Sequence, residues 1–241
     1  MAAAAPDLSI VAPVYNEAEN FPKFYGRLKE SVRTPYQLLV VYDSEDDTTL
    51  PCAREFQKSD PSVVLVKNDE RGVLGALKTG LRYPKSGALL VTMADGSDDL
   101  GQVDAMVELY RQGYSVVAAS RYARGGRQLG GPPLKKALSR VAGLSLKLLA
   151  GVPTSDPTNN FKLYSKELID KIEIESQGGF EVALELTVKA YALGLRIAEI
   201  PTVWTDRVAG QSNFKLLKWM PHYLRWYRAA LAHRAAHWIP G

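Results

Sequence analysis

The sequence predicts an α/β protein in which helices cover both faces of a mostly parallel central sheet. Short β-rich runs alternate with helical segments along the first hundred residues. Helical connections of about 10 to 15 residues between strands indicate right-handed crossovers, and therefore a parallel sheet. With 241 residues, 46% of them apolar, the chain is long enough for one large domain with a full core. We predict a single domain.

Hydrophobic periodicity predicts the bounds of each strand and helix in turn. The predicted strands are β-rich apolar runs that end in polar residues, at 8–15, 36–43, 62–68 and 87–95. The predicted helices lie between them, at 16–31, 48–59 and 72–83. In the first helix, Phe21, Phe24 and Leu28 recur at helical spacing.

Composition excludes several classes of protein. A single cysteine, Cys52, excludes an intramolecular disulfide and every cysteine-rich zinc pattern. The start, MAAAAPDLSI, has no basic region before a long apolar core, so we predict no signal peptide. No stretch reaches the roughly 18 apolar residues of a membrane span. We expect a cytoplasmic protein that is either soluble or bound to the cytoplasmic face of a membrane at its surface only.

Charge is distributed unevenly along the chain. Residues 1–108 hold 17 acidic and 11 basic residues, whereas the segment from Leu109 to Ser155 has eight basic residues and no acid. Acids are absent again after Asp206, where six Lys and Arg remain. This segregation favours an acidic, metal-binding half that faces an anion-binding half, with ordinary solvated surface as the alternative.

Polar residues follow each of the four predicted strands. In parallel sheets with helices on both faces, ligands bind at the carboxyl ends of the strands, where the winding order reverses. We therefore expect one crevice lined by four clusters, which are Pro13 to Glu17, Asp43 to Asp47, Asn68 to Gly72, and Asp95 to Asp99.

These clusters belong to an ordered series of motifs: VAPVYNEAENF, VVYDSEDDT, ERGVLGALKTGL, MADGSDD, SRYARGG, DPTNNFKLY, GGFEVALEL and DRVAGQSNFK. The series resembles family 2 glycosyltransferases, and among them the polyprenyl- and dolichol-phosphate sugar transferases, the group of the dolichol-phosphate mannose synthases. The resemblance covers roughly residues 8–216. It implies a GT-A fold, which we assign to a domain over 1–216. The residue pattern of the remaining segment, 217–241, predicts a basic amphipathic helix.

The resemblance also implies a reaction. A sugar would pass, with inversion at its anomeric carbon, from a nucleotide-sugar donor (GDP-mannose or a UDP-hexose) to a polyprenyl or dolichyl phosphate. A lipid phosphate with a second pKa near about 6 is already anionic at neutral pH and needs no general base. A hydroxyl acceptor would need one, and Asp156, Glu181 or Asp98 could serve.

The same resemblance implies a nucleotide site formed by Pro13, Tyr15, Glu17 and Asp43, with Gly72 allowing close approach of the backbone. Residue chemistry supports it, because a nucleobase needs a flat apolar surface and a few polar edges. The alternative for Glu17 is the first turn of a helix that Asn16 caps.

In this family the fourth strand ends in Asp-any-Asp, whose carboxylates bind Mg²⁺ or Mn²⁺ on the donor diphosphate. Here Met93 stands at the first of these positions and Asp95 at the last. We predict that Asp95 holds the metal and that Asp98 supplies a second carboxylate from the following turn. The alternative is that Ser97 caps a helix that starts at Asp98.

The resemblance also implies that basic residues bind the acceptor phosphate. The resemblance assigns this to Arg121, Lys136 and Arg207, and it makes Arg121 and Arg207 catalytic together with Asp95. Three further residues fall in segments that line the sugar and acceptor region, Asp156, Asn160 and Glu181. Asp156 could instead be an Asx-turn residue before Pro157.

The C-terminal segment, KLLKWMPHYLRWYRAALAHRAAHWIP, combines aromatic and basic residues without an acid. Pro221 suits the first position of a helix. The helix either lies at a membrane interface or packs on the domain through its aromatic face, and both can hold. A membrane partner subunit is compatible with this arrangement.

Two other classes of function stay open. One is a glycosyltransferase that acts on a saccharide, protein or small-molecule hydroxyl. The other is a non-catalytic nucleotide-sugar-binding protein, suggested by Met93. A dehydrogenase is disfavoured because no G-x-G-x-x-G follows the first strand, and nucleic-acid binding is disfavoured because the expected crevice is acidic.

Overall fold

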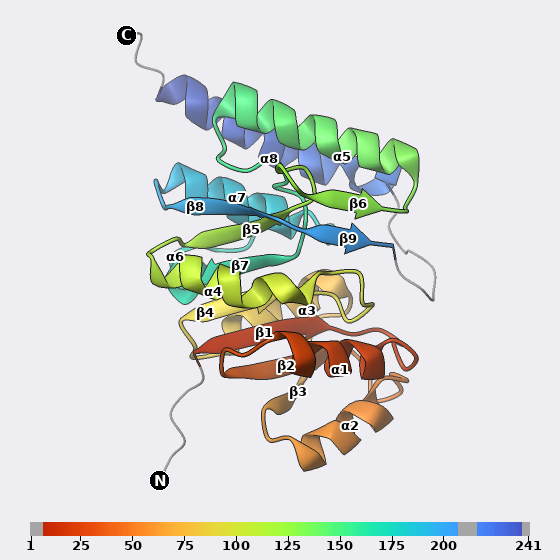
Figure 1. The fold of residues 1–241 in the computed structure, drawn as a ribbon. Helices are drawn as coiled ribbons and strands as arrows, with labels where there is room; N and C mark the ends of the chain where they lie inside the picture. Colours follow the sequence, from red (N-terminus) through yellow and green to blue (C-terminus); the bar gives the residue numbers. More distant parts are fainter. Residues whose placement is uncertain (1–6, 207–215, 238–241) are drawn as a thin grey trace.

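The structure is a computed structural model that describes residues 7–206 and 216–237 (Figure 1). Its main sheet has seven strands in the order β3-β2-β1-β4-β7-β5-β8. They are β1 (Leu8–Pro13), β2 (Tyr36–Tyr42), β3 (Val63–Lys67), β4 (Ala88–Val91), β5 (Val116–Ser120), β7 (Lys162–Ser165) and β8 (Ile197–Pro201). Only β7 is antiparallel to its neighbours, so the predicted mostly parallel sheet is confirmed. A second, two-stranded sheet pairs β6 (Arg127–Leu129) with β9 (Val203–Thr205).

Helices cover both faces of the main sheet. They are α1 (Phe21–Ser31), α2 (Leu50–Ser59), α3 (Val73–Arg82), α4 (Val103–Arg111), α5 (Pro133–Ser145), α6 (Lys166–Lys171), α7 (Val182–Ala192) and α8 (Leu216–Ala236). Two short turns complete the chain, the 3-10 turn η1 (Leu100–Gln102) and the π-helical turn η2 (Leu146–Ala150), which continues α5. In residues 7–206 and 216–237, no helix is long and apolar enough to cross a membrane.

Strand β1 shows why the sheet has a core on each side. Successive side chains of a strand point to opposite faces, and Leu8 and Ile10 join the cluster that packs under α1, α2 and α4. Val11 joins the opposite cluster, under α3, α6 and α7. Gly80 lets α3 approach β1 closely, because a Cβ at this position would lie 2.2 Å from Val11 Cγ1.

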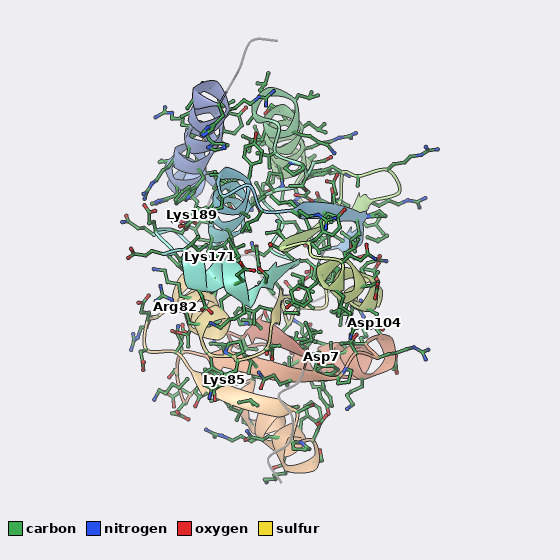
Figure 2. All side chains as sticks on the ribbon, turned by 90° about the vertical axis from the view of Figure 1, so that its left-hand side faces the viewer. Asp7, Arg82, Lys85, Asp104, Lys171 and Lys189 are labelled. Carbon is green, nitrogen blue, oxygen red and sulfur yellow. The ribbon has the colours of Figure 1, made fainter. Side chains whose placement is uncertain are left out.

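Helix α8 packs on the domain through an aromatic face. Trp226 and Ala230 are buried in a third cluster with residues of η2 and α7. Tyr227 Oη donates a hydrogen bond of 2.9 Å to Ser145 Oγ at the end of α5. Lys189 of α7, labelled in Figure 2, lies with its ammonium 5.0 Å from the Trp226 ring. Packing against the domain therefore uses the aromatic residues that the sequence singled out.

Three sequence-based boundaries differ from the structure. The helix predicted at 16–31 begins only at Phe21. Asn16 is not its cap: the residue has a φ of 56°, and its side-chain oxygen accepts a hydrogen bond from Thr48 N. Pro221 was predicted at a helix start and lies inside α8. The fourth strand stops at Val91, so residues 92–99 form a turn.

Candidate functional site

The winding order of the main sheet reverses at β1. From β1 the chain winds outward through β2 and β3, and it then returns to the other side of β1 as β4. In sheets of this kind, ligands bind at the carboxyl ends of the strands where the winding order reverses. The turn after β4, which carries the aspartates, lies at this reversal.

The aspartates after β4 fold the chain into a tight turn. Asp98 Oδ2 accepts hydrogen bonds from Thr92 Oγ1 at 2.9 Å and from Met93 N at 3.1 Å. Asp95 Oδ1 accepts one from Ser97 N at 3.0 Å. Gly96, with a φ of 76°, allows the bend. Thus the backbone of Met93 holds Asp98 in place, although its side chain cannot replace a carboxylate.

The helix-cap alternative for this segment is wrong. The helical turn after it is η1, which starts at Leu100, and Asp99 is the residue whose carboxylate accepts from Gly101 N. Ser97 caps no helix, and Asp98 lies outside the helical turn. Asp99 therefore has a structural role, whereas Asp95 and Asp98 do not cap a helix.

Asp95 and Asp98 are both buried and both line a cavity. Burial, and then the neighbouring charge of Asp95, raise the pKa of Asp98 to about 7. Two close carboxylates in a site of low polarity suit a hard divalent cation, whose preferred ligands are oxygens. No group of three or more acidic, His or Cys side chains able to hold a metal occurs in the described ranges. Among the described residues, Asp95 and Asp98 are the pair of carboxylates at this turn that could hold such a cation.

Arg121, directly after β5, is held by Asp156. Its Nε and Nη2 donate to the two carboxylate oxygens at 2.7 and 2.8 Å, and its backbone N donates at 3.1 Å. Burial disfavours the charged form of both groups, but the attraction between them is stronger than this effect. Asp156 therefore raises the pKa of Arg121, and Arg121 keeps the pKa of Asp156 below its ordinary value. Asp156 is thus an ion-pair partner, and not merely an Asx-turn residue as the alternative proposed.

Sequence reasoning missed Lys162 on β7. Its side chain is fully buried, and its ammonium donates to the carbonyl oxygens of Pro157 and Asn159. Burial lowers the pKa of Lys162 to about 7 although Asp156 opposes this. The residue ties down the loop that precedes β7. The available signal was a lysine within the otherwise apolar run FKLY, where a strand buried on both faces is expected.

A cavity of about 620 Å³ is lined both by this polar cluster and by apolar side chains of α5, η2, α7 and α8. Its polar lining includes Asp95, Asp98, Arg121, Asn159 and Asn160. Its aliphatic and aromatic lining includes Leu138, Ala142, Leu146, Leu184, Tyr223 and Leu224. The cavity therefore suits an amphiphilic molecule, which carries both a charged group and hydrocarbon.

The predicted nucleotide residues gather at the carboxyl ends of β1 and β2. Asp43 accepts hydrogen bonds from Gly72 N at 2.7 Å and from Asn68 Nδ2 at 2.9 Å, so the structure brings Asp43 and Gly72 together. Tyr15 is 65% exposed beyond β1, and Glu17 accepts from Asn20 Nδ2. None of the predicted nucleotide residues, Pro13 included, lines the cavity as the described residues define it.

Of the residues predicted to contact the sugar or the acceptor phosphate, some line the cavity and others do not. Asn160 lines the cavity and donates to Phe180 O. Glu181 is buried beside it and accepts from the backbone N–H groups of residues 177–179, so it holds a loop. Lys136 donates from Nζ to Gln128 O, while its neighbour Lys135 lines the cavity. Arg207 lies outside the described residues.

The chain matches a family model and is similar in sequence to several known proteins. Residues 9–173 match the family model described as glycosyl transferase family 2. The chain is 33% identical over 211 residues to an undecaprenyl-phosphate mannosyltransferase of Micrococcus luteus, covering 84% of this chain and 85% of that protein. It is 25% identical over 227 residues to a dolichol-phosphate mannosyltransferase of Pyrococcus furiosus, covering 90% of this chain and 63% of that one.

Solved structures share the fold. Glucosyl-3-phosphoglycerate synthase of Mycobacterium tuberculosis, in complex with Mn²⁺, UDP and glucosyl-3-phosphoglycerate, superimposes with a TM-score of 0.62 at 18% identity, covering 99% of this chain and 82% of that one. A mannosyltransferase of Pyrobaculum calidifontis, in complex with GDP-Man and Mn²⁺, also gives 0.62 at 18% identity, covering 96% and 74%. The fold is therefore GT-A, as predicted.

Proposed function

The chain belongs to glycosyltransferase family 2, and on that premise we propose that it transfers a hexosyl group from a nucleotide sugar to the phosphate of a polyprenyl lipid. Two relatives named for mannosyl transfer to undecaprenyl or dolichol phosphate support this acceptor class. GDP-mannose or a UDP-hexose is the donor we propose.

The cavity is the observation that carries the proposal. Its lining combines two buried carboxylates and a fixed guanidinium with aliphatic and aromatic side chains of α5, α7 and α8. A saccharide acceptor would leave those apolar walls unmatched, because sugar hydroxyls need hydrogen-bonding partners when they are buried. A phosphate on a hydrocarbon chain matches both kinds of lining.

Arg121 is the residue that we propose to position the acceptor phosphate. Asp156 occupies Nε and Nη2 of its guanidinium, and Nη2 also donates to Ser139 Oγ. Within the described parts of the chain, no hydrogen bond involves Nη1, whose two N–H groups are the donors that a phosphate would use. Asp156 therefore acts as a positioning residue, since it fixes the plane of the guanidinium.

In the proposed displacement, a phosphate oxygen of the acceptor attacks the anomeric carbon of the sugar. The bond from that carbon to the donor diphosphate breaks, and the nucleoside diphosphate leaves with the electron pair. In-line attack inverts the carbon, and the anionic phosphate needs no general base. Asp95 and Asp98 would hold Mg²⁺ or Mn²⁺, which, when bound, neutralises charge on the leaving diphosphate.

The donor nucleotide is proposed to lie over the ends of β1 and β2, at Pro13, Tyr15, Glu17, Asp43 and Gly72. The exposed Tyr15 ring offers a surface for a base. The Asp43 carboxylate, already oriented by Gly72 N and Asn68, suits a ribose hydroxyl. Contributions of Lys136 and Arg207 to the acceptor phosphate, and of Asn160 and Glu181 to the sugar, stay predictions.

The test is transfer from labelled GDP-mannose and UDP-hexoses to a short polyprenyl phosphate by the full-length protein, with Mn²⁺, Mg²⁺ or a chelator. The matching polyprenol without phosphate and a simple saccharide are parallel acceptors. We expect a glycolipid product with the phosphate acceptor alone. Asp95→Asn should abolish it, whereas Asp99→Asn, which alters the neighbouring cap residue of η1, should leave it nearly unchanged.

Other outcomes favour the alternatives. Product formed on a hydroxyl acceptor but not on the phosphate would replace our proposal with transfer to a hydroxyl. Binding of nucleoside diphosphate without transfer or donor hydrolysis under any metal condition would favour the non-catalytic class.

A further inference from the structure

The small sheet of β6 and β9 turns one of its faces to the cavity. The two strands pair in parallel, with Gln128 of β6 beside Trp204 of β9, and they lie side by side below α5 in Figure 1. In each strand the middle residue is partly buried and its two neighbours are exposed. Gln128 and Trp204 are these middle residues, and both line the cavity. Because side chains alternate along a strand, the inner face presents a carboxamide and an indole ring together.

The two side chains border the same small space. A Cβ at Gly131, which also lines the cavity, would lie 3.2 Å from Gln128 Nε2 and 3.6 Å from Trp204 Cζ3. Tyr122 Oη donates a hydrogen bond of 3.3 Å to Gln128 Oε1. This bond orients the amide, and the two N–H groups of Nε2 are the donors that the side chain can offer to a ligand.

Backbone hydrogen bonds place β9 between the two charged parts of the site. Thr205 N donates to Ser97 O at 3.0 Å, in the turn that carries the aspartates. Thr202 N donates to Ser120 O at 3.0 Å, directly before Arg121. The strand therefore runs from the carboxylates proposed for the donor diphosphate to the guanidinium proposed for the acceptor phosphate.

In the proposed transfer, the hexose lies between the same two groups. Its anomeric carbon is bonded to the donor diphosphate and is attacked by the acceptor phosphate, so the ring occupies the space between the carboxylates and the guanidinium. A hexose presents C–H groups on the faces of its ring and hydroxyls around its edge. An indole ring matches a C–H face, and an amide N–H group donates to a hydroxyl.

We propose that Trp204 and Gln128 bind the hexose of the nucleotide-sugar donor. The indole of Trp204 packs on one face of the ring, and Gln128 Nε2 donates to a hydroxyl at its edge. Asp156, which the sequence placed near the sugar, has both carboxylate oxygens on Arg121. This inference rests on the proposed function, because it takes a nucleotide sugar as the donor.

The experiment compares two affinities of the full-length protein, one for a nucleoside diphosphate and one for the matching nucleotide sugar. Isothermal titration calorimetry with Mn²⁺ and without acceptor measures both, for GDP with GDP-mannose and for UDP with UDP-glucose. The test variants are Trp204→Leu and Gln128→Leu. Leu129→Ala and Val203→Ala, at exposed positions on the outer face of the same sheet, are the matched controls. Thermal unfolding checks that each variant folds.

We expect the test variants to bind the nucleoside diphosphate as tightly as the wild type does, because this ligand lacks the hexose. Each should bind the nucleotide sugar about three- to tenfold more weakly, the size expected when one ring contact or one hydrogen bond is lost. Both controls should match the wild type with either ligand.

Three results would overturn the proposal. One is an unchanged affinity of the test variants for the nucleotide sugar. Another is an equal loss of affinity for both ligands, which would assign the sheet to the nucleotide or to the fold. The third is a variant with both affinities intact and a raised KM for a short polyprenyl phosphate, which would assign this face to the acceptor.

The same measurements separate this inference from the proposed function. A wild type that loses affinity for the nucleotide sugar on either test substitution, yet transfers to no polyprenyl phosphate, upholds the hexose site and refutes the proposed acceptor. A wild type that transfers normally while both test variants bind the nucleotide sugar unchanged refutes the hexose site alone. Absence of nucleotide-sugar binding by the wild type under every metal condition refutes both.

Discussion

Asp98→Asn replaces a buried carboxyl group with a neutral amide of nearly the same shape. The amide oxygen can still accept from Thr92 Oγ1 and Met93 N, which donate to one carboxylate oxygen in the structure. The substitution therefore removes the charge that burial and Asp95 oppose while it keeps the turn. We expect the variant to be more stable than the wild type at neutral pH in the absence of metal.

The magnitude follows from the pKa of Asp98, which rises from the ordinary 3.8 to about 7. At about 1.4 kcal/mol per pKa unit, this difference corresponds to roughly 4 kcal/mol. Between about pH 4 and about pH 7 the folded wild type retains a proton that the unfolded chain has released, so rising pH favours unfolding in this window. The stability advantage of the variant should therefore grow by up to about 4 kcal/mol across the window and stay constant above it.

Urea unfolding, followed by tryptophan fluorescence in chelator-containing buffers at several pH values, measures this advantage. The difference between variant and wild type cancels the titration of groups common to both, such as Asp60 and Asp156. Asp99→Asn makes the same change of carboxylate to amide at the neighbouring turn residue and serves as the control for the chemistry of the substitution. An Asp98→Asn difference that does not change with pH would refute the electrostatic account of the turn.

Three further predictions test the packing. Asp156→Asn should lower the free energy of unfolding by about 3–5 kcal/mol in urea, because Arg121 would be buried without its partner; a loss below about 1 kcal/mol would contradict a buried pair. Gly80→Ala should destabilise by about 1–3 kcal/mol because its Cβ would lie 2.2 Å from a β1 side chain, whereas Gly26→Ala, with nothing within 4 Å, should be neutral or slightly stabilising; equal melting temperatures would rule this out. Trp226→Ala should destabilise by about 3 kcal/mol or more and make α8 the first site of proteolysis, and an unchanged digestion pattern would show that this contact does not hold the helix.

The part of the fold that could be predicted is the part that follows from local hydrophobic periodicity. Alternating β-rich and helical segments predict the parallel strands from β1 to β4 and the helices between them, since periodicity depends on neighbouring residues only. The start of α1 could not be predicted in this way. The residues before Phe21 hydrogen-bond with Thr48 and Thr49, and bonds between segments this far apart leave no local signal.

In the candidate site, the positions of the residues at the strand ends could be predicted, whereas their pairing with residues distant in the sequence could not. The clustering of polar residues at strand ends predicts where Asp43, Asp95 and Asp98 lie, because all parallel strands end at one edge. The pairing of Arg121 with Asp156, across 35 positions, depends on β5 and β7 being neighbours. Lys162 was missed for the same reason, since its partners are defined only once the loop before β7 has folded.

Residue type and order are enough to predict the class of fold, the family, the polar clusters at the strand ends and the acid-free basic stretch from Leu109 to Ser155. Only the folded chain shows which carboxylate pairs with which cation, that the backbone of Met93 holds Asp98, and which sides of α5 and α8 are buried. Those outcomes depend on contacts between distant segments, because burial and pKa are set by whatever the folded chain brings alongside a group rather than by the residues next to it.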